Sequence, residues 1–374
     1  MKNLDSLVNE VRNKYAPDKR VALFNVIVSD SLGQLVARGE TNLPEAKIEL
    51  MNKLRAVPVE VSDSIKLLPA ENLKGKTKGI INLSVANLRS KPDNPEEMAT
   101  QSLLGTVVNV LKKQRGYYLV QTPDNYIAYV DDDGVETVTP EVAGEWIKSE
   151  KIIFTKVYGF AYEGPGEDGP TISDLVIGNI LKLAESPLNK GLFYKVLFPD
   201  GREGFVKKSE AMVFSEWLSK VNPTQENILN TAKLFMGVPY LWGGTSSKGL
   251  DCSGFTKTVY YLNGIVLARD ASQQVHNGEF VVEGIDLSKL QPGDLLFFGT
   301  KATNEKRERI THVAIYIGDS EFIHASGRVK INSLDPNRPN FVKQRFDTLI
   351  RAKRILTSIS KNGIQLLKDN KFYK

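Results

Sequence analysis

Length, composition and charge set the first limits on this chain. Its 374 residues predict two to four domains at roughly 100–200 residues each. The net charge of +5, from 49 basic and 44 acidic residues, is too small to predict a nucleic-acid partner. Hydrophobic residues make up 41% of the chain, but no run approaches the ~20 apolar residues of a membrane span, so no transmembrane segment is expected.

The cysteine count and the first residues bear on redox chemistry and location. Cys252 is the single cysteine, so an internal disulfide is excluded and a thiol nucleophile can only be this residue. The start, Met1-Lys2-Asn3-Leu4-Asp5, lacks the ~7–15 apolar residues of a signal peptide. We therefore expect either a cytoplasmic protein or a periplasmic or secreted protein of the cell envelope from which a leader has been removed.

Residues 1–70 predict a small α+β domain of unknown role. A polar, helix-like start precedes two strand-like runs and a segment with helical apolar spacing. The expected elements are a strand at 21–28, a turn at 30–33, a return strand at 34–39 and a helix at 46–54.

Two β-rich stretches follow, at residues 73–140 and 150–213. Each has short strands separated by Gly, Asn, Asp and Pro, which is typical of a small β-barrel. Each also ends with a tyrosine-containing strand, a turn and a glycine–aromatic strand. The two stretches therefore look like a weak internal repeat.

From residue 222 the pattern changes to α/β and predicts a fourth domain at 222–357. We expect a helix at 224–235, a Gly- and Ser-rich loop, a helix that begins near Cys252, and several strands, with a buried one at 295–298. Residues 358–374 form a polar tail for which no structure is predicted.

Cys252 has the surroundings of a reactive thiol. It follows a flexible loop at 243–247, and Phe255, Val259 and Leu262 repeat after it at helical spacing, so it lies in the first turn of a helix. The N–H groups and partial positive charge of a helix start lower a cysteine pKa and can donate to an oxyanion. The alternative is a buried structural cysteine, which the glycine-flanked helix start disfavours.

Two of the three histidines are placed to supply a base. His312 and His324 lie in a segment that predicts two strands around a turn at Gly318-Asp319. If the hairpin is symmetric about Gly318, the two residues face each other with Cβ atoms about 4.5–5.5 Å apart. His312 then takes the thiol proton and later protonates the leaving amine, while His324 fixes its tautomer and ring direction.

Other uses of the same residues remain open. A structural zinc site would take thiolate and imidazole ligands, but the chain lacks the paired Cys or close His spacing of such sites, so we predict no metal and no cofactor. Either strand histidine could also be an ordinary core or edge residue. His276 has no partner in the pattern and is expected on the surface or in a loop.

The reactive segment carries five motifs in order. The first motif is Tyr240–Gly244 together with Asp251–Phe255. The other four are Arg269–Gln274, Leu290–Leu295, His312–Gly318 and His324–Gly327. These motifs resemble the NlpC/P60 cell-wall peptidases, and the β-rich stretches resemble bacterial SH3 domains. The whole is similar to the dipeptidyl-peptidase VI type. The resemblance implies a multidomain α+β protein, with a papain-like catalytic domain preceded by two SH3-like β-barrels and a small N-terminal α+β domain.

The resemblance also implies roles for residues near the nucleophile. Cys252, His312 and His324 would form the catalytic group, and the Tyr240 hydroxyl would lie near the oxyanion together with the backbone of Cys252. The implied substrate contacts are Asp251 at the free amine of the substrate, and Ser253, Arg269 and Ser272 around the γ-D-Glu unit and its carboxylate.

In this family the first SH3 domain closes one side of the cleft. By motif position, Glu97 and Tyr126 would meet the substrate amine. The usual Gly-Trp after that tyrosine is replaced by Ala128-Tyr129, and Glu96 could take the role of Glu97. A carboxylate with an aromatic hydroxyl suits an ammonium group, and a closed wall would exclude N-acylated stems.

The activity that the resemblance implies is hydrolysis of the amide between γ-D-Glu and a diamino acid. Its substrates would be murein peptides with a free N-terminal L-Ala, cut by a monomer during cell-wall recycling or remodelling. Two alternatives stay open: a Cys–His amidase or acyltransferase with a non-murein substrate, and a non-catalytic wall-binding protein.

Overall fold

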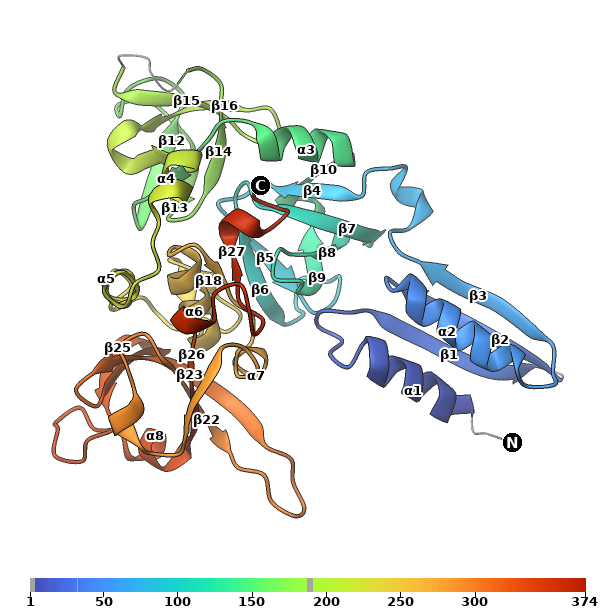
Figure 1. The fold of residues 1–374 in the computed structure, drawn as a ribbon. Coiled ribbons are helices and arrows are strands. Elements are labelled where there is room, and N and C mark those ends of the chain that lie inside the picture. Colours follow the sequence, from blue (N-terminus) through green and yellow to red (C-terminus); the bar gives the residue numbers. More distant parts are fainter. Residues whose placement is uncertain (1–3, 32, 187–190) are drawn as a thin grey trace.

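The computed structural model describes residues 4–31, 33–186 and 191–374. Figure 1 shows the chain as an N-terminal α+β part in blue, two β-rich parts in cyan and green, and a larger α/β part in yellow to red. This mixed α and β architecture confirms the predicted fold class.

The N-terminal part is a three-stranded sheet with two helices. Its elements are α1 Leu4–Tyr15, β1 Phe24–Ser31, β2 Gln34–Thr41, α2 Pro44–Arg55 and β3 Val61–Leu67. β1 and β2 form a hairpin, while β3 runs parallel to β2 after the crossover through α2. The sequence pattern did not predict β3. The turn expected at 30–33 includes Leu32, which lies outside the described residues.

The first strand begins later than predicted. Residues 16–23 form a loop, in which the backbone N–H groups of Val21 and Ala22 both donate to Asp18 O at 3.2 Å, so β1 begins at Phe24. We refer to residues 16–23 as the Asp18 loop. Its side chains contact residues outside the N-terminal part.

The two β-rich parts each contain a seven-stranded sheet, with helix α3 Pro140–Lys148 between them. The strands of the first are β4 Lys78–Ile81, β5 Val85–Arg89, β6 Met98–Leu103, β7 Val107–Gln114, β8 Tyr117–Gln121, β9 Ile127–Asp131 and β10 Val135–Val138. The strands of the second are β11 Lys151–Phe154, β12 Tyr158–Tyr162, β13 Thr171–Val176, β14 Ile180–Leu183, β15 Phe193–Leu197, β16 Glu203–Lys207 and β17 Ala211–Val213.

The two sheets have the same strand order. The first reads β10-β4-β7-β8-β9-β5-β6, and the second, read from its opposite end, is β17-β11-β14-β15-β16-β12-β13. Each strand of one sheet therefore takes the position of its counterpart seven strands later in the chain. The weak repeat expected from the sequence is confirmed at the level of topology.

The C-terminal part is built on a six-stranded antiparallel sheet with the order β21-β26-β22-β23-β24-β25. Its strands are β21 Glu279–Glu283, β22 Leu295–Thr300, β23 Arg309–Gly318, β24 Glu321–Ser326, β25 Arg328–Ser333 and β26 Leu349–Arg354. Its helices are α5 Gln225–Lys233, α6 Cys252–Tyr261, α7 Ala271–Gln274 and α8 Lys343–Thr348, and α4 Phe214–Lys220 leads into it. Helix α6 packs against β23 and β24, with Phe255 and Val259 fully buried.

The last residues, the polar tail for which the sequence predicted no structure, are packed against the rest of the protein. β27 Gln365–Leu366 pairs with β20 Ile265–Val266 of the α/β part. Asn370 then donates from Nδ2 to Pro123 O at 3.2 Å, and Phe372 packs with Ile80 of the first β-rich part and with Trp146 of α3. The sequence pattern gave no prediction here because the apolar residues that anchor this segment are few and show no periodicity.

Candidate active site

The nucleophile candidate lies where the sequence placed it, at the first residue of α6. The Asp251 side chain caps the helix by accepting from the Gly254 backbone N–H at 2.7 Å. Gly254 has no space for a side chain, because a Cβ would lie 1.9 Å from Gly244 O. The Cys252 side chain is 8% exposed, and the backbone N–H groups of Val313 and Ser253 are directed at its sulfur.

The expectation of a lowered thiol pKa is wrong for this free state. Burial, and after it the charge of Asp251, raise the pKa of Cys252 to about 11. The N–H group of Val313 and the charge of Arg269 act in the opposite direction but are outweighed. The sequence indicates the helix start but not the burial that opposes ionisation. The thiol is therefore protonated at neutral pH until a base removes the proton.

His312 and His324 meet, but not in the register that was predicted. Nε2 of His312 lies 2.7 Å from Nδ1 of His324, and the rings are nearly perpendicular. Ile315 pairs with Ile323, so the extended register places the two histidines diagonally, two residues out of alignment. The turn between the strands consists of Asp319 and Ser320, which both have positive φ, 51° and 63°. This two-residue turn sets the register, so the expected symmetry about Gly318 is wrong.

Asn332 on β25 completes a hydrogen-bonded relay that the sequence analysis missed. Its Oδ1 lies 3.0 Å from Nε2 of His324, and its Nδ2 donates to Asn340 O at 3.0 Å. Because the amide nitrogen is used on a carbonyl, the oxygen must face His324, and Nε2 of that ring carries the proton. Nδ1 of His324 then accepts from Nε2–H of His312. Nδ1 of His312 is left as a lone pair that can accept a proton.

Both imidazoles are neutral in this state. Burial, followed by the charge of Arg345, holds the pKa of His312 well below its usual 6.5. Burial also lowers the pKa of His324 to about 4, although the hydrogen bond that its Nε2–H donates to Asn332 acts in the opposite direction, and Arg345 adds to the lowering. Arg345 lies on α8 with its guanidinium 5.6 Å from the centre of the Phe298 ring. No motif pointed to Arg345.

Tyr240 is placed to donate near the thiol. Burial, then the charges of Cys252 and Asp251, raise the pKa of its hydroxyl to about 12, so it stays protonated and can act as a donor. Its backbone forms an isolated bridge with Leu250, two residues before the nucleophile. Tyr240 and the N–H of Cys252 together have the character of an oxyanion site.

Asp251, Ser253 and Arg269 form a buried group rather than an open pocket wall. Arg269 is 1% exposed and donates to both carboxylate oxygens of Asp251, at 2.5 and 3.1 Å, and to Ser253 Oγ at 3.1 Å. Its Nε donates to Thr100 Oγ1 at 2.8 Å, which ties the first β-rich part to the α/β part. In this structure Arg269 therefore serves as an internal cation that holds the helix cap in place.

The two candidate residues from the first β-rich part both reach the α/β part. Trp242 Nε1 donates to Glu97 Oε1 at 2.7 Å, and the Tyr126 hydroxyl donates to Asp270 Oδ2 at 3.3 Å. Glu96 instead pairs with Lys91 at 2.9 Å. Of the two acids that the sequence left open, Glu97 is the one directed at the segment before the nucleophile.

Backbone meets backbone between the same two parts. Gly243 has a φ of +79°, and a Cβ there would lie 2.2 Å from Met98 O. Thr245 and Ser246 of β18 Thr245–Ser246, which continues as a hairpin with β19 Gly249–Leu250, hydrogen-bond to Gln101 on β6. The loop before Cys252 is therefore fixed against the first β-rich part.

Ser272 and His276 do not belong to the buried group around Arg269. Ser272 accepts from Arg20 of the Asp18 loop at 2.9 Å, a contact that no motif predicted. His276 is exposed, as expected.

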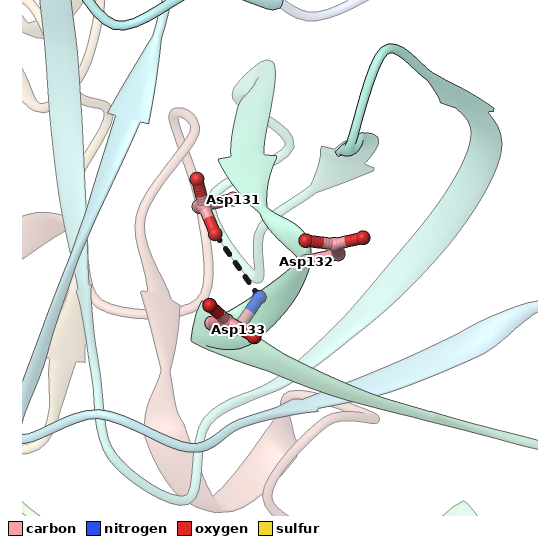
Figure 2. Close-up of side chains that lie close together, drawn as sticks. All are labelled: Asp131, Asp132 and Asp133. Carbon is pink, nitrogen blue, oxygen red and sulfur yellow. Dashed lines mark hydrogen bonds between the residues drawn. The ribbon is translucent and has the colours of Figure 1, made fainter.

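One acidic cluster brings three possible metal ligands together. Among the described residues, the single group with three suitable ligand atoms within 4.8 Å is Asp131, Asp132 and Asp133, so Cys252 and the histidines do not form one. Figure 2 shows the Asp131 carboxylate accepting from the Asp133 backbone N–H, at 3.1 Å. Asp132 pairs with Lys113 at 2.9 Å. These contacts account for the cluster as a capped turn. Within the described ranges, no helix has the length and apolarity to cross a membrane.

The thiol is buried at a helix start, and the backbone N–H of Val313, the residue after His312, is directed at it. His312 is held by His324, and His324 by Asn332, an arrangement typical of cysteine hydrolases. Comparison with known families extends this. Residues 237–350 match the NlpC/P60 family, and residues 88–135 match the bacterial dipeptidyl-peptidase Sh3 domain. The chain belongs to the NlpC/P60 family of cysteine peptidases.

Several relatives share most of this architecture. A gamma-D-glutamyl-L-lysine dipeptidyl-peptidase of Bacillus cereus is 30% identical over 260 residues, which cover 67% of this chain and 74% of that protein. Dipeptidyl-peptidase 6 of Lysinibacillus sphaericus is 29% identical over 286 residues, 73% of this chain and 97% of that one. The crystal structure of an NlpC/P60 family protein from Bacillus cereus is 27% identical and superposes with a TM-score of 0.62, covering 75% of this chain and 100% of its own.

Proposed function

We propose that this protein hydrolyses the amide bond between γ-D-Glu and a diamino acid in murein peptides that begin with a free L-Ala. Two relatives are named as dipeptidyl-peptidases, one of them for a gamma-D-glutamyl-L-lysine bond. The observation that carries the proposal is the approach of Glu97 and Tyr126 to Trp242 and Asp270, on segments that flank the nucleophile. They close one end of the site with carboxylates and a hydroxyl.

The proposed chemistry begins with two neutral groups. His312 accepts the thiol proton at Nδ1 as Cys252 sulfur bonds to the amide carbon, and the oxygen takes the negative charge. Tyr240 and the N–H of Cys252 donate to that oxygen. The C–N bond then breaks, and the proton on His312 passes to the leaving amine.

The thioester is released by the reverse proton path. His312 removes a proton from water while the water oxygen bonds to the carbonyl carbon. The C–S bond then breaks, and the sulfur of Cys252 recovers the proton from Nδ1. His324 and Asn332 take no proton in this scheme, because their hydrogen bonds keep His312 in one tautomer and one ring orientation.

The proposed preference for a free N-terminus follows from the groups at this end. A primary ammonium can be held by the acidic groups there and by the Tyr126 hydroxyl, whose pKa is raised by burial and by the charge of Asp270. An acylated N-terminus carries no charge and needs space beyond that end. The enzyme would thus cut released peptides rather than stems still attached to glycan.

The test is product analysis by mass spectrometry. The purified protein is given L-Ala-γ-D-Glu-L-Lys, the diaminopimelate analogue, and the N-acetylated form of each. Release of L-Ala-γ-D-Glu from the free peptides alone supports the proposal. Equal cleavage of the acetylated forms removes the amine pocket, and faster transfer to added amines than to water identifies an acyltransferase. Murein binding without any cleavage, unchanged in Cys252→Ala, overturns the enzymatic proposal.

A further inference from the structure

The N-terminal part reaches the candidate active site through a chain of alternating charges. Asp18 pairs with Arg20 at 2.7 Å, and Arg20 pairs with Asp270 at 2.7 Å. Asp270 lies 3.9 Å from Arg269, which pairs with Asp251 at 2.5 Å. The chain of five side chains thus runs from the Asp18 loop to the residue directly before the nucleophile.

The Asp18 loop is docked between two parts of the protein. The backbone N–H of Ile127 donates to Arg20 O at 2.6 Å, and Gln121 Nε2 donates to Val21 O at 3.1 Å. On the other side, Gln273 Nε2 of α7 donates to Asp18 Oδ2 at 2.8 Å. Both family matches begin after this loop, at residues 88 and 237. The contact is therefore a feature of this chain that neither match describes.

The hydrogen bonds of Arg20 determine how its neighbours present their polar atoms. Its Nε and Nη2 bind Asp18, and its Nη1 donates to both Asp270 Oδ2 and Ser272 Oγ, at 2.7 and 2.9 Å. Because Ser272 Oγ accepts from Arg20, its own O–H must point elsewhere and is available to a substrate. Asp270 Oδ2 accepts from Tyr126 as well, which leaves the lone pairs of the Tyr126 hydroxyl for an ammonium.

The charges of this group also favour a cation. Asp18, Asp251 and Asp270 carry three negative charges against two positive charges on Arg20 and Arg269, which leaves one net negative charge before Glu97 is added. Burial opposes the ionisation of Asp18, but hydrogen bonds from Arg20 and Gln273 outweigh it and lower the pKa to about 2. The excess negative charge is therefore kept throughout the neutral range.

We propose that the N-terminal part belongs to the substrate site, with Arg20 as a positioning residue for a peptide that has a free N-terminal ammonium beside a carboxylate. This inference rests on the proposed function. Arg20 holds Asp270 and Ser272 so that the Tyr126 hydroxyl faces the ammonium and the Ser272 hydroxyl faces the carboxylate. It does not touch the reacting atoms, so its removal weakens binding more than it slows the chemical step.

The test compares Arg20→Ala and Arg20→Lys with a control on the same part of the protein. Glu40→Gln is the control. Glu40 lies on the same N-terminal part but pairs with Lys112 of the first β-rich part, at 2.5 Å, so its substitution breaks a contact that does not reach the α/β part. The first readout is the KM and kcat for L-Ala-γ-D-Glu-L-Lys. We expect Arg20→Ala to raise KM about 10-fold, with kcat within about 3-fold of the wild type, Arg20→Lys to recover most of the loss, and Glu40→Gln to change neither value.

A binding measurement separates this inference from the proposed function. Calorimetry with the product L-Ala-γ-D-Glu, on Cys252→Ala protein with and without Arg20→Ala, should show about 10-fold weaker binding without the arginine. If the wild type cleaves nothing, the proposed function fails while this readout still tests Arg20. If Arg20→Ala behaves as Glu40→Gln does, or lowers kcat at constant KM, the inference is overturned. Should Arg20→Ala unfold, Arg20→Met replaces it, because it keeps the aliphatic stem and removes the charge, and a KM for Arg20→Met equal to that of Glu40→Gln overturns the inference.

Discussion

His324 holds His312 through a 2.7 Å contact between Nδ1 and Nε2, although the two residues are offset diagonally across their strands. The two rings are nearly perpendicular, and Nε2 of His312 points at the lone pair of Nδ1 in the plane of the His324 ring. The centre of the Phe298 ring lies 5.8 Å from that of His312, and the centre of the Phe322 ring lies 4.9 Å from that of His324. These contacts restrict rotation of both imidazoles. Orientation of the base therefore depends on packing as well as on hydrogen bonds.

Removal of the catalytic groups should separate proton transfer from orientation. Cys252→Ala and His312→Ala are each expected to reduce kcat on the order of 10³-fold or more, because each removes an atom that forms or breaks a bond. His324→Ala should keep partial activity, about 10- to 100-fold below the wild type, since it only orients the base. Steady-state kinetics on L-Ala-γ-D-Glu-L-Lys checks this. Equal, complete loss in a folded His324→Ala protein would give His324 a direct role.

Asn332 should affect kcat and leave KM unchanged. Asn332→Ala removes the acceptor at Nε2 of His324, and loss of one such hydrogen bond is expected to lower kcat about 10-fold. Asn332→Asp keeps an acceptor oxygen at that position and should restore most of kcat. Asn337→Ala is the matched control, because Asn337 is exposed and its backbone N–H and its Nδ2 both donate to Asp335. Equal activity of both alanine variants would remove Asn332 from the relay.

The raised thiol pKa should appear in alkylation kinetics. With the pKa of Cys252 at about 11, labelling by iodoacetamide at pH 7 is expected to be roughly 100-fold slower than that of a free thiol. The rate should rise continuously between pH 7 and pH 10. The same protein unfolded in urea serves as the reference. An inflection below pH 7 would contradict this and would show a preformed thiolate.

Arg345 should set the acid limit of activity. Its charge lowers the pKa of both histidines, after the larger effect of burial, so Arg345→Gln raises both values. A protonated His312 cannot accept the thiol proton, and the acid limb of kcat/KM should therefore move to higher pH. Arg345→Lys should retain the wild-type profile, and so should Lys343→Gln, which removes a largely exposed charge on the same helix. An unchanged limb in Arg345→Gln would assign the low pKa values to burial alone.

The helix start and the histidine spacing were predictable because their signals are local. Asp251 precedes a run of apolar residues at helical spacing, so the cap and the position of Cys252 follow from adjacent sequence. His312 and His324 each lie in a strand with a clear two-residue alternation, and this alternation places both side chains on the same face of the sheet. The register between the strands was not predictable, since it depends on whether the turn contains Asp319 and Ser320.

The polar network was not predictable because its members are far apart in the chain. Arg20 contacts Asp270 across 250 residues, and neither residue lies in a pattern that links them. Asn332 is one of many asparagines, and only the position of β25 beside β24 brings it to His324. The family resemblance implied that Arg269 contacts the substrate, but no sequence pattern indicated that it is buried and paired with Asp251. Local pattern indicates which residues are reactive, and tertiary packing decides what each one faces.

The direct backbone contact at Gly243 has a consequence for how this enzyme selects peptides. Where a Cβ would lie 2.2 Å from Met98 O, the main chains of two domains are in contact with no side chain between them. Side chains can change rotamer, but packed main chains yield little. The loop directly before the nucleophile is therefore held in one position against the first β-rich part and is not a lid that opens and closes. Substrate range would then change through the side chains near this loop and not through movement of these two parts.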